Sequence, residues 1–144
     1  AYVRGWRARE VVVSGLYDSI GLYDRIRASE RELAWHWLNA LSLADVADYD
    51  FHELSFGQQR LALLARAMIK YPSILVLDEP CVGLDDRYRR MIPALVDRIA
   101  EQTPTQILYV THDGEDELPG CINQCLTFVE DGDGARRIEV TPYS

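Results

Sequence analysis

The chain has 144 residues, 48% of them hydrophobic, and a formal net charge of −8 at pH 7, which fits one acidic globular domain. The negative charge argues against sequence-independent binding to phosphate backbones, so we expect no nucleic-acid partner. The sequence has no apolar run of about 18 residues and no signal-peptide pattern, so we expect a cytoplasmic location without direct insertion into a membrane.

The first twenty residues contain an apolar run behind basic residues. Val11, Val12 and Val13 follow a stretch that holds Arg7 and Arg9. The sequence begins without the polar preamble that is typical of a natural start. We therefore expect that it is cut from a longer polypeptide.

A first long helix is predicted after residue 28. Ser29 with Glu32 three residues later has the pattern of a capping box, and we expect the helix to run to about Leu43. One apolar face recurs at helical spacing and consists of Leu33, Trp37, Leu38 and Leu41. His36 lies off that face, and we expect it to be a surface histidine rather than a ligand.

Aromatic residues gather around this helix and the segment that follows it. Two interpretations remain open for them: they belong to the core, or they face a partner. The cluster consists of Trp35, Trp37, Tyr49 and Phe51.

A second helix is predicted to begin at Ser55. Ser55 and Gln58 form another capping-box pattern, and Gly57 is expected to leave the first turn uncovered. The apolar face consists of Leu61, Leu64, Ala65 and Met68. We expect the helix to end at Lys70, because a cation suits the negative end of the helix dipole and Pro72 follows.

Residues 74–77 are a short continuous apolar run, which predicts a strand that is covered on both faces. Asp78 and Glu79 come at its carboxyl end, where open α/β sheets place ligand chemistry. Taken alone, Asp78 is more simply a capping residue for the following loop. A strand-end carboxylate that holds Mg²⁺ and a helix N-terminus that binds an anion together suit a nucleoside triphosphate.

A strand, a helix and a second strand are predicted over residues 74–110. The helix spans residues 86–102 and its apolar face contains Met91, Leu95, Val96 and Ile99, while residues 107–110 form a second buried strand. In a βαβ unit the two strands are parallel and their carboxyl ends lie side by side. We therefore expect Asp78 and Glu79 to face Thr111 and His112. The alternative for His112 is a cap for a short helix at residues 114–118.

Residues 113–140 contain no further candidate catalytic residues. The acidic residues between 113 and 117 are expected to be a solvated first turn of that short helix. Residues 126–129 and 137–140 are predicted strands joined by a hairpin turn at residues 132–134.

The chain has three cysteines, Cys81, Cys121 and Cys125, an odd number that implies no disulfide framework. We expect buried thiols rather than metal ligands.

Four segments, in this order, resemble the motifs of the ABC-type ATPases. They are the signature at residues 54–58, the Walker B strand at 74–79, the D-loop at 83–85 and the switch histidine at 111–112. The sequence departs from the family pattern at Phe56, where glycine is usual, and at Cys81, where a small hydroxyl residue is common. More narrowly, residues 10–15 and 121–132 resemble the tandem ATP-binding proteins grouped with molybdate transport and photorepair.

The resemblance implies an α/β fold: the C-terminal part of a P-loop NTPase domain of ABC type, with a helical subdomain, a partial and mostly parallel sheet, and flanking helices. We expect the helical and signature subdomain at residues 1–72 and the partial catalytic core at residues 73–144. The helical subdomain of the family contacts transmembrane transporter subunits. This implies a peripheral position at the inner face of the cell membrane.

The resemblance also implies roles for single residues, with ATP and Mg²⁺ as ligands. Asp78 would hold Mg²⁺, Glu79 would orient and deprotonate the attacking water, and His112 would hydrogen-bond the γ-phosphate. The signature would bind the γ-phosphate of a nucleotide held by a second nucleotide-binding domain in a head-to-tail pair, through Leu54, Ser55, Gly57 and Gln58. Asp85 would link the two sites.

The sequence lacks the phosphate-binding loop G-x-x-x-x-G-K-S/T that this chemistry needs. Its only lysine is Lys70, without a glycine loop before it. Two hypotheses follow: a portion of an active ABC-type ATPase domain, or a non-hydrolysing module that presents its signature face to a partner domain. The intact Glu79 favours the first. A chromosome-maintenance or repair ATPase is disfavoured, because there is no coiled-coil segment and no basic surface.

Overall fold

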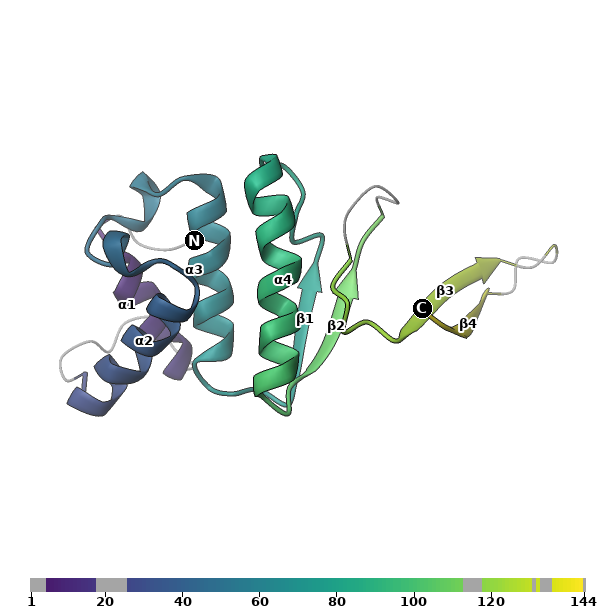
Figure 1. The fold of residues 1–144 in the computed structure, drawn as a ribbon, viewed down its shortest axis with the longest axis horizontal. Helices are drawn as coiled ribbons and strands as arrows, with labels where there is room; N and C mark the ends of the chain where they lie inside the picture. The colour runs from purple at the N-terminus through teal and green to yellow at the C-terminus, as the bar shows by residue number, and fades with distance from the viewer. Residues whose placement is uncertain (1–4, 18–25, 113–117, 131, 133–135, 144) are drawn as a thin grey trace.

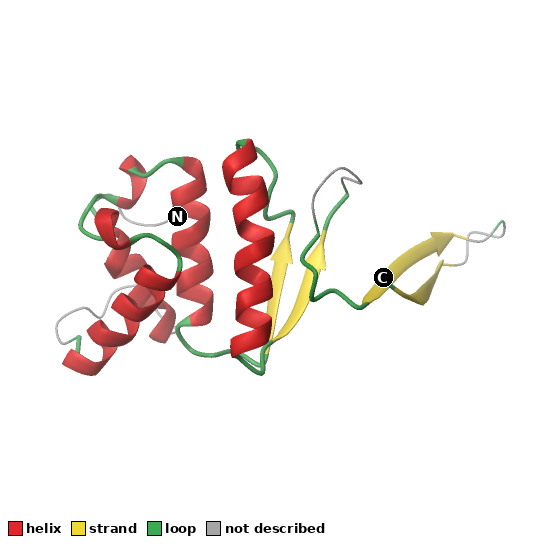
Figure 2. Ribbon diagram, viewed as in Figure 1, coloured by secondary structure: helices red, strands yellow, loops and turns green. Residues whose placement is uncertain are grey.

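A computed structural model describes residues 5–17, 26–112, 118–130, 132 and 136–143. Three α-helices, α1 (Ala8–Val13), α2 (Ala28–Ala40) and α3 (Phe56–Met68), pack together at one end of the molecule. Helix α4 (Asp86–Gln102) lies between α3 and the strands β1 (Ile74–Asp78) and β2 (Gln106–Val110) (Figures 1 and 2). Strands β3 (Gln124–Glu130) and β4 (Arg136–Pro142) form a hairpin that projects from the opposite end.

The core of the helical end is formed by aliphatic side chains. The largest fully buried ones include Val11, Val12, Leu38, Leu41, Leu43, Leu61, Met68 and Ile69. They come from α1, α2, α3 and the loops between them, so the apolar stripe of each helix is buried against the other two. The apolar faces predicted for α2 and α3 are confirmed. Within the described ranges, no helix is both long and apolar enough to cross a membrane.

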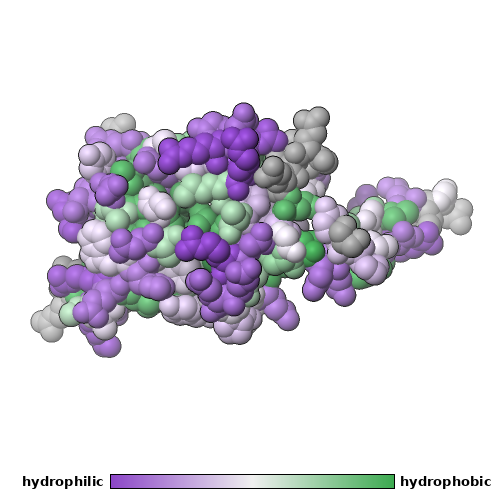
Figure 3. Space-filling view, viewed as in Figure 1, coloured by the Kyte–Doolittle hydropathy of each residue, from purple (hydrophilic) through white to green (hydrophobic). Residues whose placement is uncertain are grey.

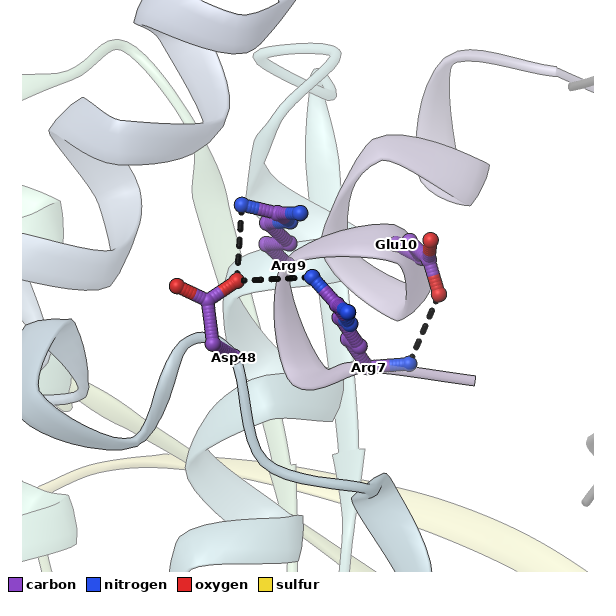
Figure 4. A network of polar contacts seen from close by, with 4 residues as sticks. All are labelled: Arg7, Arg9, Glu10 and Asp48. Atoms are coloured by element: carbon purple, nitrogen blue, oxygen red, sulfur yellow. Dashed lines mark hydrogen bonds and ion pairs between the residues drawn. The ribbon is translucent and has the colours of Figure 1, made fainter. Parts of the chain in front are cut away.

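The start of α1 is fixed by polar contacts with the loop that follows α2 (Figure 4). The carboxylate of Asp48 accepts from the guanidinium groups of Arg7 at 3.4 Å and Arg9 at 2.7 Å. The Glu10 carboxylate accepts from the backbone N–H of Arg7 at 2.7 Å. Because these groups are well exposed, we expect the contacts to orient the loop and to add little to the free energy of unfolding.

The predicted capping position of α2 at Ser29 is wrong by two residues, because the N-cap is Arg27. The helix begins at Ala28, and the capping carboxylate is Glu30, which accepts from the backbone N–H of Arg27 at 2.8 Å. The hydroxyl of Tyr17 donates to the same carboxylate at 2.7 Å. This contact, distant in sequence, holds Glu30 rather than Glu32 in the capping position. The helix ends at Ala40, earlier than the predicted Leu43.

The aromatic residues around α2 divide between core and surface. Trp37 and Phe51 are buried, whereas Trp35 and Tyr49 are exposed. His36 is exposed, as predicted, and its ring lies edge-on to Trp37. The core interpretation is confirmed for Trp37 and Phe51, and contact with a partner stays a prediction for Trp35 and Tyr49.

The βαβ unit is confirmed. Strands β1 and β2 pair in parallel, with Ile74 opposite Gln106 and Asp78 opposite Val110. Helix α4 has the predicted bounds, and its residues Leu95, Val96 and Ile99 are buried. The regular apolar spacing in the sequence predicted this helix correctly. Its apolar face packs against the adjacent strands, as expected for an outer helix.

The predictions that β1 is covered on both faces and that β2 is buried are wrong. Leu75 is buried, but Ile74 and Val76 are each 57% exposed and Leu108 is 43% exposed. Side chains alternate between the two faces of a strand, and in the described structure α4 covers only one of them. An apolar sheet face is therefore left open to solvent.

This uncovered face should make residues 1–144 self-associate, because large exposed apolar patches recruit another surface. Light scattering should show species larger than a monomer, and replacing Val76 and Leu108 with serine should shift the distribution toward monomer. Tyr49→Ser, an exposed aromatic at the helical end, serves as the control and should not. A clean monomer for the unmodified chain would contradict this expectation.

The hairpin predicted near the end of the chain is confirmed. Its strands pair antiparallel, with Leu126 opposite Val140 and Phe128 opposite Ile138. These four side chains share one face and are exposed. Of the predicted turn, only Gly132 lies among the described residues. The predicted acidic helix turn at residues 113–117 lies outside them.

The cysteines are free thiols, but only Cys81 is buried, so the expectation of three buried thiols is wrong for Cys121 and Cys125. The backbone N–H of Cys121 donates to Asp97 on α4 at 2.8 Å, which ties the hairpin linker to the body. Burial would raise the pKa of Asp97, but this hydrogen bond and one from the Gly120 amide outweigh it and lower the pKa. Burial and the neighbouring Asp97 raise the pKa of Cys121 to about 11, so this thiol stays protonated at neutral pH.

Candidate active site

The carboxyl end of β1 places two acidic residues at one edge of the sheet. Asp78 is the last residue of β1, and the backbone N–H of Glu79 donates to the carbonyl of Val110 on β2 at 2.9 Å. The ladder between the strands therefore continues one residue beyond β1. This contact fixes the position of Glu79 relative to the end of β2.

Glu79 adopts a backbone conformation that is rare for residues with a side chain. Its φ of 45° lies in the left-handed region. Such a conformation costs on the order of 1–3 kcal/mol and is common at functional sites. Besides the bond to Val110, the Glu79 carbonyl accepts from the N–H of Val82 at 3.2 Å. These two bonds hold the strained turn.

His112, from the segment after β2, reaches this carboxylate. Its Nε2 lies 3.3 Å from Oε1 of Glu79, and the side chains are 81% and 38% exposed, respectively. The parallel pairing of β1 and β2 brings the two together, so the juxtaposition inferred from the βαβ pattern is confirmed. Thr111 lies beside them in sequence and is half-buried.

The donor set at this edge fits a metal ion that is shared with a phosphate ligand. The carboxylate of Asp78 is exposed, and no cluster of three or more His, Cys, Asp or Glu side chains suited to a metal occurs in the described part of the chain. Magnesium bound with a nucleotide needs only one or two carboxylates, with phosphates and waters as the other ligands. Asp78 fits such a partial site.

Asp78 also lines a hollow between α3 and β1. Its walls are mostly apolar and include Leu64 and Val76, and Arg60 is a charged residue of the lining besides Asp78. In Figure 3 green apolar surface shows between the purple patches over the helical part of the molecule. Leu75, Val76 and Leu77 of β1 line the hollow together with Asp78.

The capping box at the start of α3 is confirmed. The Oγ of Ser55 accepts from the backbone N–H of Gln58 at 3.2 Å, and the Gln58 side chain accepts from the Ser55 N–H at 2.9 Å. The Ser55 hydroxyl hydrogen is still available to donate to an anion. The helix ends at Met68 with Ile69 as the C-cap, so the predicted end at Lys70 is two residues too late.

The expectation that Gly57 leaves the first turn uncovered is wrong. Gly57 is buried, and a methyl group placed on it would overlap the ring of Tyr88 from α4. Leu54, the first signature residue, is buried in the core, so only its backbone faces the turn. Sequence reasoning missed Tyr88 because an aromatic residue in the first turn of a helix has no distinctive pattern.

Asp85 caps α4, because its side chain accepts from the backbone N–H of Tyr88 at 3.1 Å. In Figure 1 four element termini lie at the upper end of their helices and strands: the N-terminal ends of α3 and α4 and the carboxyl ends of β1 and β2. The predicted site residues are thus gathered at that end, although the signature turn and the Glu79–His112 pair are separate groups.

Comparison with known proteins decides the family. A protein-family model described as ABC transporter matches residues 6–82, more than half of the chain. The chain belongs to the ABC transporter family. Its membership as an ABC ATP-binding chain agrees with the resemblance drawn from the four motifs.

Curated ABC relatives match most of this chain but are much longer. The ABC transporter ATP-binding protein ModF of Escherichia coli is 46% identical over 86% of this chain and 25% of its own length. The ABC transporter ATP-binding protein YlmA of Bacillus subtilis is 41% identical over 78% of this chain and 43% of its own length. The chain thus spans less than half of either relative.

Solved ABC structures share the fold. One, described as a metal-chelate type ABC transporter in an inward-facing conformation, matches 100% of this chain and 70% of its own with a TM-score of 0.71 at 17% identity. The dimeric bacterial ABC transporter cassette MJ0796 matches 77% of this chain and 48% of its own with a TM-score of 0.63 at 26% identity. The predicted fold class, an α/β ABC-type cassette, is confirmed.

Proposed function

We propose that residues 1–144 supply the hydrolytic edge and the signature face of an ABC-type ATP-binding domain, which couples binding and hydrolysis of Mg-ATP to transport. The observation that carries this proposal is the contact between Glu79 and His112, 3.3 Å apart at the carboxyl ends of two parallel strands. Family membership supports ATP as the ligand.

Each residue at the sheet edge has a role that follows from its chemistry. Asp78 would hold Mg²⁺, directly or through water, and the ion supplies positive charge against the β- and γ-phosphate oxygens. The Glu79 carboxylate orients a water molecule in line with the γ-phosphorus and accepts its proton as the oxygen attacks. His112 donates a hydrogen bond to a γ-phosphate oxygen and also positions Glu79 through the contact between them.

The P-loop must come from a segment outside residues 1–144, because the only lysine, Lys70, lies just after the C-terminal end of α3. We call residues 1–144 together with that segment the assembled cassette. The proposed division is a helical and signature subdomain at residues 1–72 and a partial catalytic core at residues 73–144. The clustering of α1, α2 and α3 at one end supports this division.

The signature turn would face a second nucleotide-binding domain in a head-to-tail pair. Ser55, Gly57 and Gln58 lie at the N-terminus of α3, where unpaired backbone N–H groups favour an anion, and Asp85 would connect the two sites.

Exposed Trp35 and Tyr49 at the helical end suit contact with transmembrane subunits. That contact would place the assembly at the inner face of the membrane. The molybdate-related role rests on the sequence resemblance.

One observation favours the alternative of a non-hydrolysing module, namely the absence of a P-loop from this sequence. The strained backbone at Glu79 favours hydrolysis, because a protein that only presents its signature gains nothing from a carboxylate held in this position. Measured ATP turnover by the assembled cassette separates the two.

Ser55→Arg should block closure of two assembled cassettes around ATP while each still binds nucleotide at its own P-loop. The long cation fills the N-terminal turn of α3, where the γ-phosphate of the opposite domain would lie. Equilibrium nucleotide binding and light scattering with Mg-ATP measure the two steps. Ser29→Arg, at an exposed position in the first turn of α2, is the matched control. Loss of nucleotide from the mutated domain itself would contradict the trans geometry.

A further inference from the structure

We propose that Tyr88 and Phe56 are positioning residues that clasp the signature turn and the D-loop turn into one rigid unit. An aromatic ring from each turn packs against a glycine of the other turn. Tyr88, from the helix that follows the D-loop, covers Gly57 of the signature, and Phe56 of the signature lies beside Gly83 of the D-loop. We call these two contacts the ring clasp. Its role in turnover rests on the proposed function.

The first contact is tight. The position of a side chain on Gly57 is filled by the Tyr88 ring, so the ring packs directly on the signature backbone. The backbone N–H of Tyr88 is in turn held by the Asp85 carboxylate at 3.1 Å. Tyr88 therefore connects the two turns: its backbone N–H binds Asp85 of the D-loop, and its ring packs on Gly57 of the signature. A residue larger than glycine at position 57 would push the helices apart.

The second contact runs in the opposite direction. A methyl group on Gly83 would lie 3.7 Å from Cε1 of Phe56, an ordinary van der Waals distance. Gly83 has a φ of 75°, so its backbone conformation is one that side chains rarely adopt. Phe56 is 57% exposed, so its ring rests on the D-loop without being part of the core. This contact gives a reason for the departure from the family glycine at this position.

Both rings are also held by arginines on their own helices. The guanidinium of Arg60 lies 5.5 Å from the centroid of the Phe56 ring, and that of Arg87 lies 5.8 Å from the Tyr88 ring. These are cation–π distances, which favour one orientation of each ring. The clasp is therefore oriented from both sides. A displacement of the signature turn by a nucleotide in the opposite domain would carry the D-loop with it.

Hydrogen exchange on residues 1–144 tests the clasp without any nucleotide. Phe56→Ala should speed exchange of the Tyr88 amide, and Tyr88→Ala should speed exchange of the Gln58 amide, each by about tenfold, because each ring stabilises the other turn. Tyr88→Phe keeps the ring and should leave the Gln58 amide unchanged. Tyr49→Ala, an exposed aromatic at the helical end, is the control and should change neither amide.

Two results would overturn the clasp: faster exchange confined to the helix that carries the substitution, or an equal effect of Tyr49→Ala. If Tyr88→Ala fails to fold, Phe56→Ala decides, because its exposed ring is not part of the core. In the assembled cassette, Tyr88→Ala should lower kcat about tenfold with KM for ATP changed less than about twofold, and Tyr88→Phe should restore kcat. If the unmodified cassette hydrolyses no ATP, the proposed function fails, while the exchange result still decides the clasp.

Discussion

Residues 1–144 alone should show no measurable ATP hydrolysis and should bind Mg-ATP with millimolar affinity at best. A P-loop normally supplies several charge-assisted hydrogen bonds, each worth roughly 1.5–3 kcal/mol, so the loss of three weakens binding by about three orders of magnitude or more. The sequence holds neither that loop nor its lysine. Calorimetry with Mg-ATP and a steady-state phosphate-release assay measure both quantities.

Lys70→Ala is the matched control for this expectation. Because Lys70 lies after the end of α3 rather than at the sheet edge, its replacement should leave the weak binding unchanged. Micromolar binding by residues 1–144, or binding that depends on Lys70, would mean that the chain contains a phosphate site of its own. The assignment of a separate P-loop segment would then be wrong.

In the assembled cassette, Glu79→Gln should keep ATP binding and lower turnover by roughly two or more orders of magnitude. The amide has nearly the shape of the carboxylate, so the strained turn and the contact region of His112 are retained. It cannot accept the proton of the attacking water. Nucleotide binding and steady-state hydrolysis measured on the same preparation separate the two effects.

Glu101→Gln provides the comparison for Glu79→Gln, because Glu101 is an exposed glutamate near the end of α4, far along the helix from the site. That variant should hydrolyse ATP at the unmodified rate. Near-normal steady-state hydrolysis by Glu79→Gln would remove Glu79 from its assigned role as the base, whatever the geometry of its contact with His112.

Local signals predicted local structure well. The capping box of Ser55 and Gln58 and the bounds of α4 follow from side-chain chemistry and spacing within a few residues. The start of α2 did not, because the capping carboxylate is selected by a hydrogen bond from Tyr17, which lies elsewhere in the sequence. The exposure of Ile74 and Val76 was not predicted either, since an apolar run indicates which side chains can be buried and not what buries them.

The same distinction applies to the site. The approach of His112 to Glu79 was predictable because a βαβ unit places the ends of its two strands together. The packing of Tyr88 on Gly57 was not, because it depends on how α3 and α4 lie against each other. A glycine within a helical apolar pattern is the one signal that would have suggested a close contact there. The roles of all the predicted site residues stay predictions, namely those of Leu54, Ser55, Gly57, Gln58, Asp78, Glu79, Asp85 and His112.

The most direct test of the account is reconstitution. Residues 1–144 would be combined with a P-loop segment from an ABC ATP-binding protein, and phosphate release from Mg-ATP would be measured for each part and for the mixture. The account predicts hydrolysis only when both parts are present, and its loss when residues 1–144 carry Glu79→Gln. Hydrolysis by residues 1–144 alone, or by the mixture regardless of Glu79→Gln, would contradict it.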